Sequence, residues 1–415
     1  MIKYLFVTIL AFSTQQIVCQ NFTTNLNFKN KAVKKSTISF ELINNCIVIP
    51  VRINKSDNLN FILDSGTSET IITELPEKEY NKLKFSDKTH IFGIGNGHEI
   101  EADKSYGNKI QIGSIIGDYQ DITVAKPDKI NYYKYFGTEI NGIIGSDIFN
   151  NFIVIIDYSK NKITFYLPGK FEYKKKYEIY SSSSLEIVEN KPLLNISTVQ
   201  GLSSREPEKT LISTGSDFSI QFFENSIIKP DTNRVIIYDK LGIGLCGDIY
   251  GKKSRIDSLE FINHKLSQVT CIYPEKYQYS KYLENNKSSF SSVVGGRILK
   301  KFDLIIDYPN QKISVKPNKY FHQPFNFDMS GLEIESYFKD LPIYTIKNVN
   351  PESPAKEAGF KKGDQIISVN GQSTLNLSLS TIREMFISTE IQEYSIKILR
   401  EDNILDITLK LKPNL

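Results

Sequence analysis

The stretch FILDSGTSETI, residues 61–71, decides how this sequence is interpreted, because a second version of it, TLISTGSDFSI, occupies residues 210–220. Each version runs from apolar residues through a short polar segment with a glycine and back to apolar residues. The earlier version has Asp64 where the later one has Ser213. If both are copies of one loop, the second copy lacks the carboxylate of the first.

Two further pairs of segments recur at nearly the same spacing. GIGNG begins at Gly93 and GIGLCG begins at Gly242, a separation of 149 residues (242 − 93). GIIGSDIF contains Gly145 and SVVGGRIL contains Gly295, a separation of 150 residues (295 − 145). Similarity at a fixed period indicates a repeated structural unit. Together with the opening pair, these segments predict a duplicated unit of about 150 residues.

Both copies have the pattern of β structure. FIVIIDYSKNKITFY consists of two apolar, partly alternating runs around a polar turn, which is typical of two strands. Two copies of one lobe are expected to pack about a pseudo-twofold axis, as in a symmetric dimer, so that equivalent loops face each other across a cleft. We predict a mainly β protein with one lobe over residues 36–175 and the other over 180–318.

The character of the chain changes after Pro317, which indicates a third unit over residues 328–413. NVNPESPAKEAGFKKGDQIISVNGQ contains turn signals, the clearest being Asn370-Gly371. The later segment LSTIREMFIS has its apolar residues at helical spacing. We expect a small domain of strands and helices here.

These segments resemble two known families. FILDSGTSETII resembles the active-site loop of aspartic peptidases, and GIGNG resembles the glycine-rich flap of their retroviral-type members. IIGSDIF and VVGGRIL resemble the apolar segment that passes beside the catalytic loop in that family. The segment NVNPESPAKEAGFKKGDQIISVNGQ resembles a PDZ domain of bacterial exported proteases. Paired retropepsin-like or pepsin-like lobes with a C-terminal PDZ domain look like the aspartyl protease family proteins predicted in Bacteroidetes.

The resemblance implies a catalytic site at the facing loops. Aspartic peptidases use two carboxyl groups that share one proton to activate a water molecule. A serine hydroxyl donates and accepts hydrogen bonds but is not an acid of comparable strength at neutral pH. The expected set, with a serine in place of the second aspartate, is Asp64, Ser65, Gly66, Thr67, Ser213, Thr214 and Gly215.

We therefore expect peptide-bond hydrolysis to be impaired or absent. Asp217 is a poor substitute for the second carboxyl group, because it would reach the catalytic position only if the loop rearranged. A dimer that pairs two Asp64 lobes is disfavoured because the second lobe competes for the same interface. The main hypothesis is an exported protein of aspartic-peptidase fold that binds extended peptides between its lobes. The alternative is a non-catalytic pseudopeptidase and PDZ adaptor of the cell envelope.

Two binding segments follow from the resemblance. Glycines suit a flap that moves and approaches a ligand backbone, and PDZ domains bind the carboxylate of a protein C-terminus through backbone amides. The alternative for the flaps is a pair of glycine-rich hairpins that bind no ligand. The alternative for the PDZ-like unit is a module that packs against the rest of the protein and binds no ligand. The expected flap residues are Gly93, Ile94, Gly95, Gly97, Gly242 and Gly244, and the expected PDZ carboxylate loop is Gly331, Leu332, Glu333 and Ile334.

The N-terminus predicts export. Lys3 precedes a short apolar run, which has the outline of a secretory signal peptide over residues 1–20. Cys19 follows Val18, which is not a small residue, so we do not expect lipoprotein anchoring. The expected location is the periplasm or cell envelope, with membrane contact only during export.

Charge and cysteine content exclude several other classes. Lys and Arg number 51 against 47 Asp and Glu, a net charge of +4, which argues against nucleic-acid binding. The His residues are scattered without metal-ligand spacing, so neither a metal nor a cofactor is expected. We expect a monomer that binds peptides or unfolded proteins. A disulfide between Cys246 and Cys271 stays open at this point.

Overall fold

The computed structural model describes most of the chain. The described residues are 26–201, 203–204, 206–285, 289–339 and 341–412. The predicted signal peptide, Cys19 included, lies outside them. Within these ranges, no helix has the length and apolar character needed to cross a membrane.

Lobe 1 is built on a nine-stranded sheet that curls on itself, since β8 and β9, which lie next to its two ends, also pair with each other. The strand order is β1-β9-β6-β10-β5-β4-β8-β7, with β3 beside β4. Its strands are β1 (Asn27–Phe28), β3 (Glu41–Ile43), β4 (Cys46–Ile53), β5 (Leu59–Leu63), β6 (Ile71–Ile72), β7 (Phe85–Ile91), β8 (Ile100–Ile112), β9 (Ile115–Ala125) and β10 (Gly142–Ile144).

Lobe 2 has a matching sheet of nine strands. The order is β14-β15-β17-β22-β18-β21-β20-β19, with β16 beside β15. Its strands are β14 (Glu186–Val188), β15 (Lys191–Gln200), β16 (Ser203–Ser204), β17 (Glu208–Ile212), β18 (Ile220–Phe222), β19 (Ile237–Gly244), β20 (Gly247–Phe261), β21 (His264–Pro274) and β22 (Ser292–Val294). The parallel pair β5–β10 of lobe 1 recurs here as β17–β22.

A six-stranded sheet joins the two lobes, in the order β13-β24-β23-β11-β12-β2. Its strands are β2 (Lys35–Ser39), β11 (Ile153–Asp157), β12 (Lys162–Tyr166), β13 (Ser181–Ser184), β23 (Phe302–Asp307) and β24 (Lys312–Pro317). At its centre Ile155 pairs with Ile305, a separation of 150 residues (305 − 155), which is the period of the repeat. The pseudo-twofold axis therefore passes through this pair, and the predicted duplicated β architecture is confirmed.

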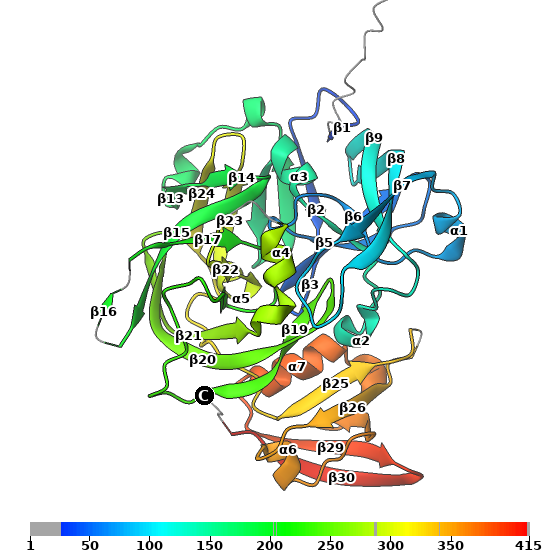
Figure 1. The fold of residues 1–415 in the computed structure, drawn as a ribbon, viewed down its shortest axis with the longest axis vertical. Coiled ribbons are helices and arrows are strands. Elements are labelled where there is room, and N and C mark those ends of the chain that lie inside the picture. The colour runs from blue at the N-terminus through cyan, green and yellow to red at the C-terminus, as the bar shows by residue number, and fades with distance from the viewer. Residues whose placement is uncertain (1–25, 202, 205, 286–288, 340, 413–415) are drawn as a thin grey trace, which may run out of the picture.

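The C-terminal unit, residues 328–412, has a separate six-stranded sheet in the order β25-β26-β27-β29-β30, with β28 beside β27. Its strands are β25 (Leu332–Ser336), β26 (Tyr344–Val349), β27 (Gln365–Val369), β28 (Gln372–Ser373), β29 (Glu393–Arg400) and β30 (Asn403–Lys410). It packs against α2 and β19 of the two lobes (Figure 1).

Helices are short throughout the described residues. The α-helices are α1 (Glu77–Tyr80), α2 (Tyr133–Phe136), α3 (Ser146–Asn151), α4 (Ser280–Glu284), α5 (Gly296–Leu299), α6 (Pro354–Glu357) and α7 (Leu379–Ile387), and the 3-10 helices are η1 (Pro168–Lys170), η2 (Lys175–Tyr177), η3 (Lys276–Gln278) and η4 (Thr374–Asn376). The predicted helix near the C-terminus is α7. The Ser378 side chain caps its first turn, and Leu379, Ile382 and Phe386 are buried along one face.

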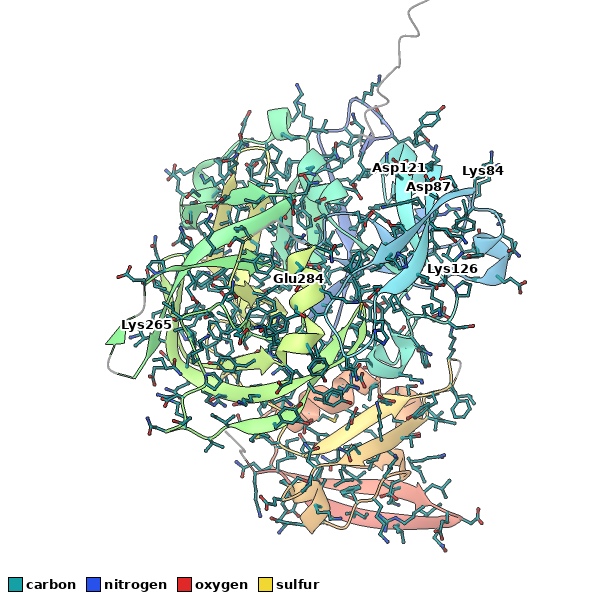
Figure 2. All side chains as sticks on the ribbon, viewed as in Figure 1. Lys84, Asp87, Asp121, Lys126, Lys265 and Glu284 are labelled. Carbon is teal, nitrogen blue, oxygen red and sulfur yellow. The ribbon has the colours of Figure 1, made fainter. Side chains whose placement is uncertain are left out.

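One apolar core runs through both lobes, and a second core belongs to the C-terminal unit. Phe61 of lobe 1 and Phe302 of lobe 2 belong to the same buried cluster, so the lobes form one folded body. The separate cluster includes Ile346 and Phe386. Charged side chains of both signs, such as Lys84 and Asp87, lie on the outside (Figure 2).

Candidate active site

Asp64 and Ser213 lie at equivalent positions of the two lobes. Asp64 directly follows β5, and its N–H donates to the carbonyl of Ile144 at 3.0 Å. Ser213 directly follows β17, and its N–H donates to the carbonyl of Val294, also at 3.0 Å. The two side chains meet between the lobes, where Ser213 Oγ donates to Asp64 Oδ1 at 2.8 Å.

Asp64 is held by hydrogen bonds from both lobes. From its own loop, the Gly66 N–H donates to Oδ1 at 2.8 Å and Thr67 Oγ1 donates to Oδ2 at 2.7 Å. From lobe 2, the Gly215 N–H donates to Oδ1 at 3.1 Å, alongside Ser213. A Cβ atom on Gly215 would lie 2.6 Å from Asp64 Cβ, so this contact requires glycine. All four partners are donors, and the carboxyl group therefore acts as an acceptor.

Ser65 and Thr214 connect the two loops by reciprocal hydrogen bonds. The Ser65 N–H donates to Thr214 Oγ1 at 3.0 Å, and the Thr214 N–H donates to Ser65 Oγ at 3.2 Å. Each hydroxyl then donates across the interface, Ser65 Oγ to Ile212 O at 2.6 Å and Thr214 Oγ1 to Leu63 O at 2.7 Å. Both side chains are fully buried. The network fixes the relative position of the loops and so the 2.8 Å contact between Ser213 and Asp64.

Asp217 is a second carboxyl group in the cleft, but it faces another partner. The hydroxyl of Tyr135 donates to its Oδ2, and its backbone carbonyl accepts from Arg297 Nε at 3.0 Å. Burial raises the pKa of its carboxyl group. Among the described residues, no hydrogen bond joins Asp217 to Asp64 or Ser213. Asp217 therefore does not stand in the place of a carboxyl partner to Asp64.

The two glycine-rich flaps, residues 93–97 and 242–247, contact each other. The Gly97 N–H donates to the carbonyl of Cys246 at 2.7 Å, and the Cys246 N–H donates to that of Ile94 at 3.2 Å. A Cβ on Gly244 would lie 1.9 Å from Ile94 O. Gly95 has φ +150°, and a Cβ there would lie 2.3 Å from the Cys246 carbonyl carbon. We expected these glycines to approach a ligand backbone, and here several approach the opposite flap.

The flaps and loops enclose a cleft cavity of about 160 Å³. The expected site residues that line it are Asp64, Gly66, Thr67, Gly93, Ile94, Ser213, Gly215, Gly242 and Gly244. The remaining expected residues of the catalytic and flap sets do not line the cavity. Ser65 and Thr214 connect the two loops, and Gly95 and Gly97 take part in the contact between the flaps.

Sequence reasoning missed several lining residues, among them the polar side chains of Tyr135 and Gln221. Gln221 interrupts the otherwise apolar segment IQFF, residues 220–223, which was the available signal for it. No local signal marked Tyr135, because its role depends on α2 reaching Asp217 of the other lobe.

The expected carboxylate loop of the C-terminal unit already holds a carboxylate of this chain. The N–H groups of Ser330 and Gly331 donate to Asp328 Oδ1 at 2.8 and 3.2 Å, and the Leu332 N–H donates to Ser330 Oγ at 3.0 Å. Burial raises the pKa of Asp328. The backbone donors at the start of this loop are thus engaged from within the chain.

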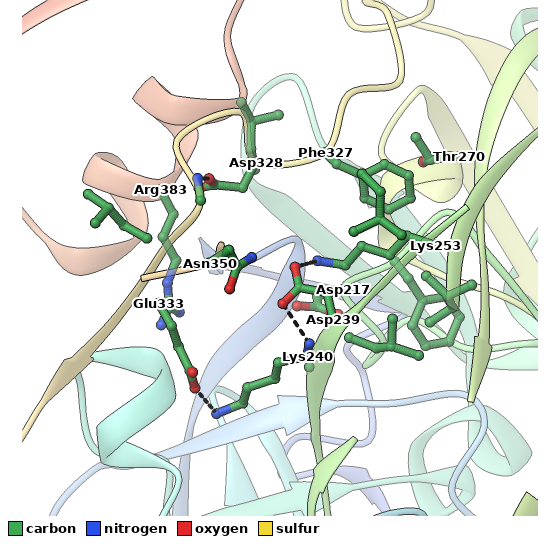
Figure 3. A pocket seen from close by; sticks show the side chains of 18 of the residues that line it. Asp217, Asp239, Lys240, Lys253, Thr270, Phe327, Asp328, Glu333, Asn350 and Arg383 are labelled. Atoms are coloured by element: carbon green, nitrogen blue, oxygen red, sulfur yellow. Dashed lines mark hydrogen bonds and ion pairs between the residues drawn. The ribbon is translucent and has the colours of Figure 1, made fainter. Parts of the chain in front are cut away.

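A second cavity of about 170 Å³, the interdomain cavity, lies between β19 of lobe 2 and β25 of the C-terminal unit (Figure 3). Its lining includes all four expected loop residues, Gly331, Leu332, Glu333 and Ile334. Lys240 of β19 bridges to Glu333 at 2.9 Å. The loop therefore faces lobe 2 rather than open solvent.

Arg383 closes the groove between β25 and α7. Its guanidinium donates to the carbonyl of Ile334 at 2.7 Å and to that of Tyr135. The guanidinium carbon also lies 4.5 Å from the centre of the Tyr135 ring. Because β25 is the edge strand of its sheet, this arginine occupies a backbone acceptor that an added peptide strand would use.

The cysteines of the described residues are unpaired. Cys46, Cys246 and Cys271 are buried thiols, so the disulfide between Cys246 and Cys271 that the sequence left open is not formed.

Two family models match the chain. Residues 49–148, which include the Asp64 loop, match a family described as aspartyl protease, and residues 345–400 match the PDZ domain. Among solved structures, the crystal structure of an aspartic proteinase from Irpex lacteus matches with a TM-score of 0.45 and 11% identity, covering 70% of this chain and 100% of that chain. No curated protein matches the chain. The chain therefore carries a domain similar to aspartyl proteases, matched over lobe 1, and, towards its C-terminal end, a PDZ domain.

Proposed function

We propose that this protein binds extended peptides in the cleft between its lobes and hydrolyses them weakly or not at all. The observation that carries the proposal is the 2.8 Å hydrogen bond from Ser213 Oγ to Asp64 Oδ1. In the two-carboxyl mechanism that position belongs to a group able to share a proton with its neighbour. Here it belongs to a hydroxyl group.

The chemistry explains the expected loss of rate. Asp64 has the geometry of a general base that removes a proton from a water molecule in the cleft. The reaction also needs an acid that protonates the departing nitrogen, and the Ser213 hydroxyl is too weak an acid for that task. Acid–base assistance from one positioned group contributes about 10²–10⁴-fold in rate. A chain with Asp64 alone is therefore expected to bind peptides far better than it cleaves them.

We further propose that the protein works outside the cytoplasm, in the periplasm or cell envelope. The support is the sequence pattern of a charged residue, an apolar run and polar residues within 1–20. Unfolded or extended polypeptides of that compartment are the proposed ligands.

Substituting Asp64→Asn tests the function of the cleft. We expect wild type and Asp64→Asn to bind members of a peptide library with similar affinity, measured by fluorescence anisotropy, and to release little or no cleaved product at acid or neutral pH. Asp157→Asn, at a turn outside the cleft lining, is the matched control. Cleavage that Asp64→Asn abolishes and Asp157→Asn keeps would instead show an active peptidase, and wild type that binds no peptide would contradict the proposal.

The PDZ domain supports a second candidate function, the binding of a protein C-terminus. PDZ domains add a peptide to an edge strand, and β25 is such a strand. Because Arg383 occupies its Ile334 carbonyl, an incoming strand must first displace the arginine.

We therefore expect Arg383→Ala to tighten binding of a C-terminal peptide by about tenfold or more, since a hydrogen bond from a charged group contributes about 1.5–3 kcal/mol. Titration calorimetry with free-acid and C-terminally amidated peptides measures the effect. Lys397→Ala, an exposed cation on β29 of the same domain, serves as the control. An Arg383→Ala affinity no higher than that of the control would show that Arg383 does not close the groove.

A further inference from the structure

We propose that Gln221 forms a subsite in lobe 2 that recognises a carboxamide, so that the cleft prefers peptides with Asn or Gln at one fixed position. This inference rests on the proposed function, because it requires a peptide in the cleft. It concerns which peptides bind there, a property that Asp64 and Ser213 do not determine.

Gln221 belongs to the wall of the cleft. On the lobe 2 sheet it pairs with Val293 of β22 on one side and with Ile272 of β21 on the other. Val293 in turn pairs with Leu211 of β17. All four residues line the cleft cavity. They form one row across four neighbouring strands, and Gln221 is the polar member of the row.

The amide group of Gln221 has no partner among the described residues. Its side chain is 0% exposed, and neither Nε2 nor Oε1 makes a hydrogen bond. A buried polar group without a partner costs about 1–3 kcal/mol of stability. Buried polar groups in native proteins are otherwise nearly always bonded, so an exception requires an explanation. A ligand that supplies the missing bonds is such an explanation at a site that lines a cavity.

Lobe 1 shows that the fold does not require a polar residue here. Ile71 pairs with Ile143 in lobe 1 as Gln221 pairs with Val293 in lobe 2. Ile71 is buried in an apolar cluster that includes Tyr132 of the segment before α2. An aliphatic side chain therefore serves the structural need at this register position. The amide of Gln221 adds hydrogen-bonding capacity that the packing of lobe 2 leaves unused.

The free groups of Gln221 specify the chemistry of the ligand. Its amide offers N–H donors and a carbonyl acceptor side by side, and another carboxamide matches both through two antiparallel hydrogen bonds. A carboxylate would leave the Oε1 acceptor unmatched, and an ammonium group would leave the Nε2 donors unmatched. Val293, Ile272 and Leu211 suit the methylene groups of an Asn or Gln side chain. Gln221 lines the cavity while its amide is fully buried, so a ligand side chain must enter the wall of the cavity to reach the amide.

The test measures the affinity of wild type for one peptide series randomised at a single position at a time. We expect Asn or Gln to bind at least about tenfold more tightly than their apolar isosteres Leu and Met at one position, since each tenfold corresponds to about 1.4 kcal/mol. Gln221→Met, which keeps the length and removes the amide, should abolish that preference and raise the melting temperature. Gln200→Met, whose amide bonds to Lys229 outside the cleft lining, is the matched control.

The outcomes separate this inference from the proposed function. Peptide binding without an Asn or Gln preference, or with a preference that Gln221→Met leaves intact, overturns the inference and leaves peptide binding standing. Wild type that binds no peptide overturns both. If Gln221→Met does not fold, the affinities of wild type for Asn against Leu peptides and for Gln against Met peptides still test the carboxamide preference. Gln221→Glu provides a second variant, which should shift the preference away from the carboxamide.

Discussion

Replacing Ser213 with aspartate is expected to raise the rate of peptide hydrolysis by about 10²–10⁴-fold over wild type. Ser213 Oγ already lies 2.8 Å from Asp64 Oδ1, so a carboxyl group on the same backbone position comes within hydrogen-bonding reach of Asp64. Two carboxyl groups that close cannot both ionise cheaply and therefore share a proton. The shared proton supplies the acid that the wild-type site lacks.

The pH profile gives this prediction its sharpest form. With Asp64 and an aspartate at position 213 acting together, hydrolysis should follow a bell-shaped curve with its maximum on the acid side of neutral. Release of a fluorescent fragment from a quenched peptide measures the rate. Ser213→Asn is the control, because it has nearly the same size and no acid. Equal rates for the two variants, with peptide binding intact in both, would show that the architecture around the loops no longer supports catalysis.

Thr214→Val is expected to lower the free energy of unfolding of the two-lobe body by about 2–4 kcal/mol, because two buried polar groups lose their partner. These groups are the N–H of Ser65 and the carbonyl of Leu63, which Thr214 Oγ1 binds at 3.0 and 2.7 Å. Valine has nearly the volume of threonine, so no cavity contributes to the loss. Chemical denaturation of the full chain, followed by tyrosine fluorescence, measures the effect.

A double-mutant cycle with Ser65→Ala identifies the source of this loss. Residues in one hydrogen-bond network show coupling energies of about 0.5–3 kcal/mol, and Ser65 and Thr214 each donate to the other's side chain. Thr164→Val, in an exposed hydroxyl pair with Thr37, is the control and should change stability little. Additive effects of Ser65→Ala and Thr214→Val would contradict the view that they connect the lobes as one unit.

The repeat made the architecture predictable from the sequence, whereas contacts between distant segments could not be predicted. The matched segments around Asp64 and Ser213 carry the loop geometry locally, in a glycine and two small hydroxyl residues, so equivalent loops were expected to face each other. The glycines around Gly95 likewise indicated a flap that approaches another backbone. It contained no sign that the neighbour would be Cys246, because that contact depends on how the two lobes dock.

The same limit applies to the PDZ domain. Turn and helix signals predicted a domain with α7, since Leu379 and Ile382 show a local periodicity. The closure of its groove by Arg383 depends on Tyr135, which is 248 residues away in the chain (383 − 135). No local pattern of charge or hydrophobicity reports a contact over such a separation.

The carboxylate of Asp328 competes with any incoming carboxylate for the backbone donors of the PDZ loop. It is tied to the backbone amides of Ser330 and Gly331 by a linker of one or two residues. A group tethered so closely competes at an effective concentration in the millimolar range or above. A C-terminus that binds directly from solution must displace the Asp328 carboxylate from these amides. A polypeptide already held in the neighbouring cleft arrives with a comparable local concentration of its own. We therefore expect free C-termini to bind the loop more weakly than C-termini of polypeptides that the lobes already hold.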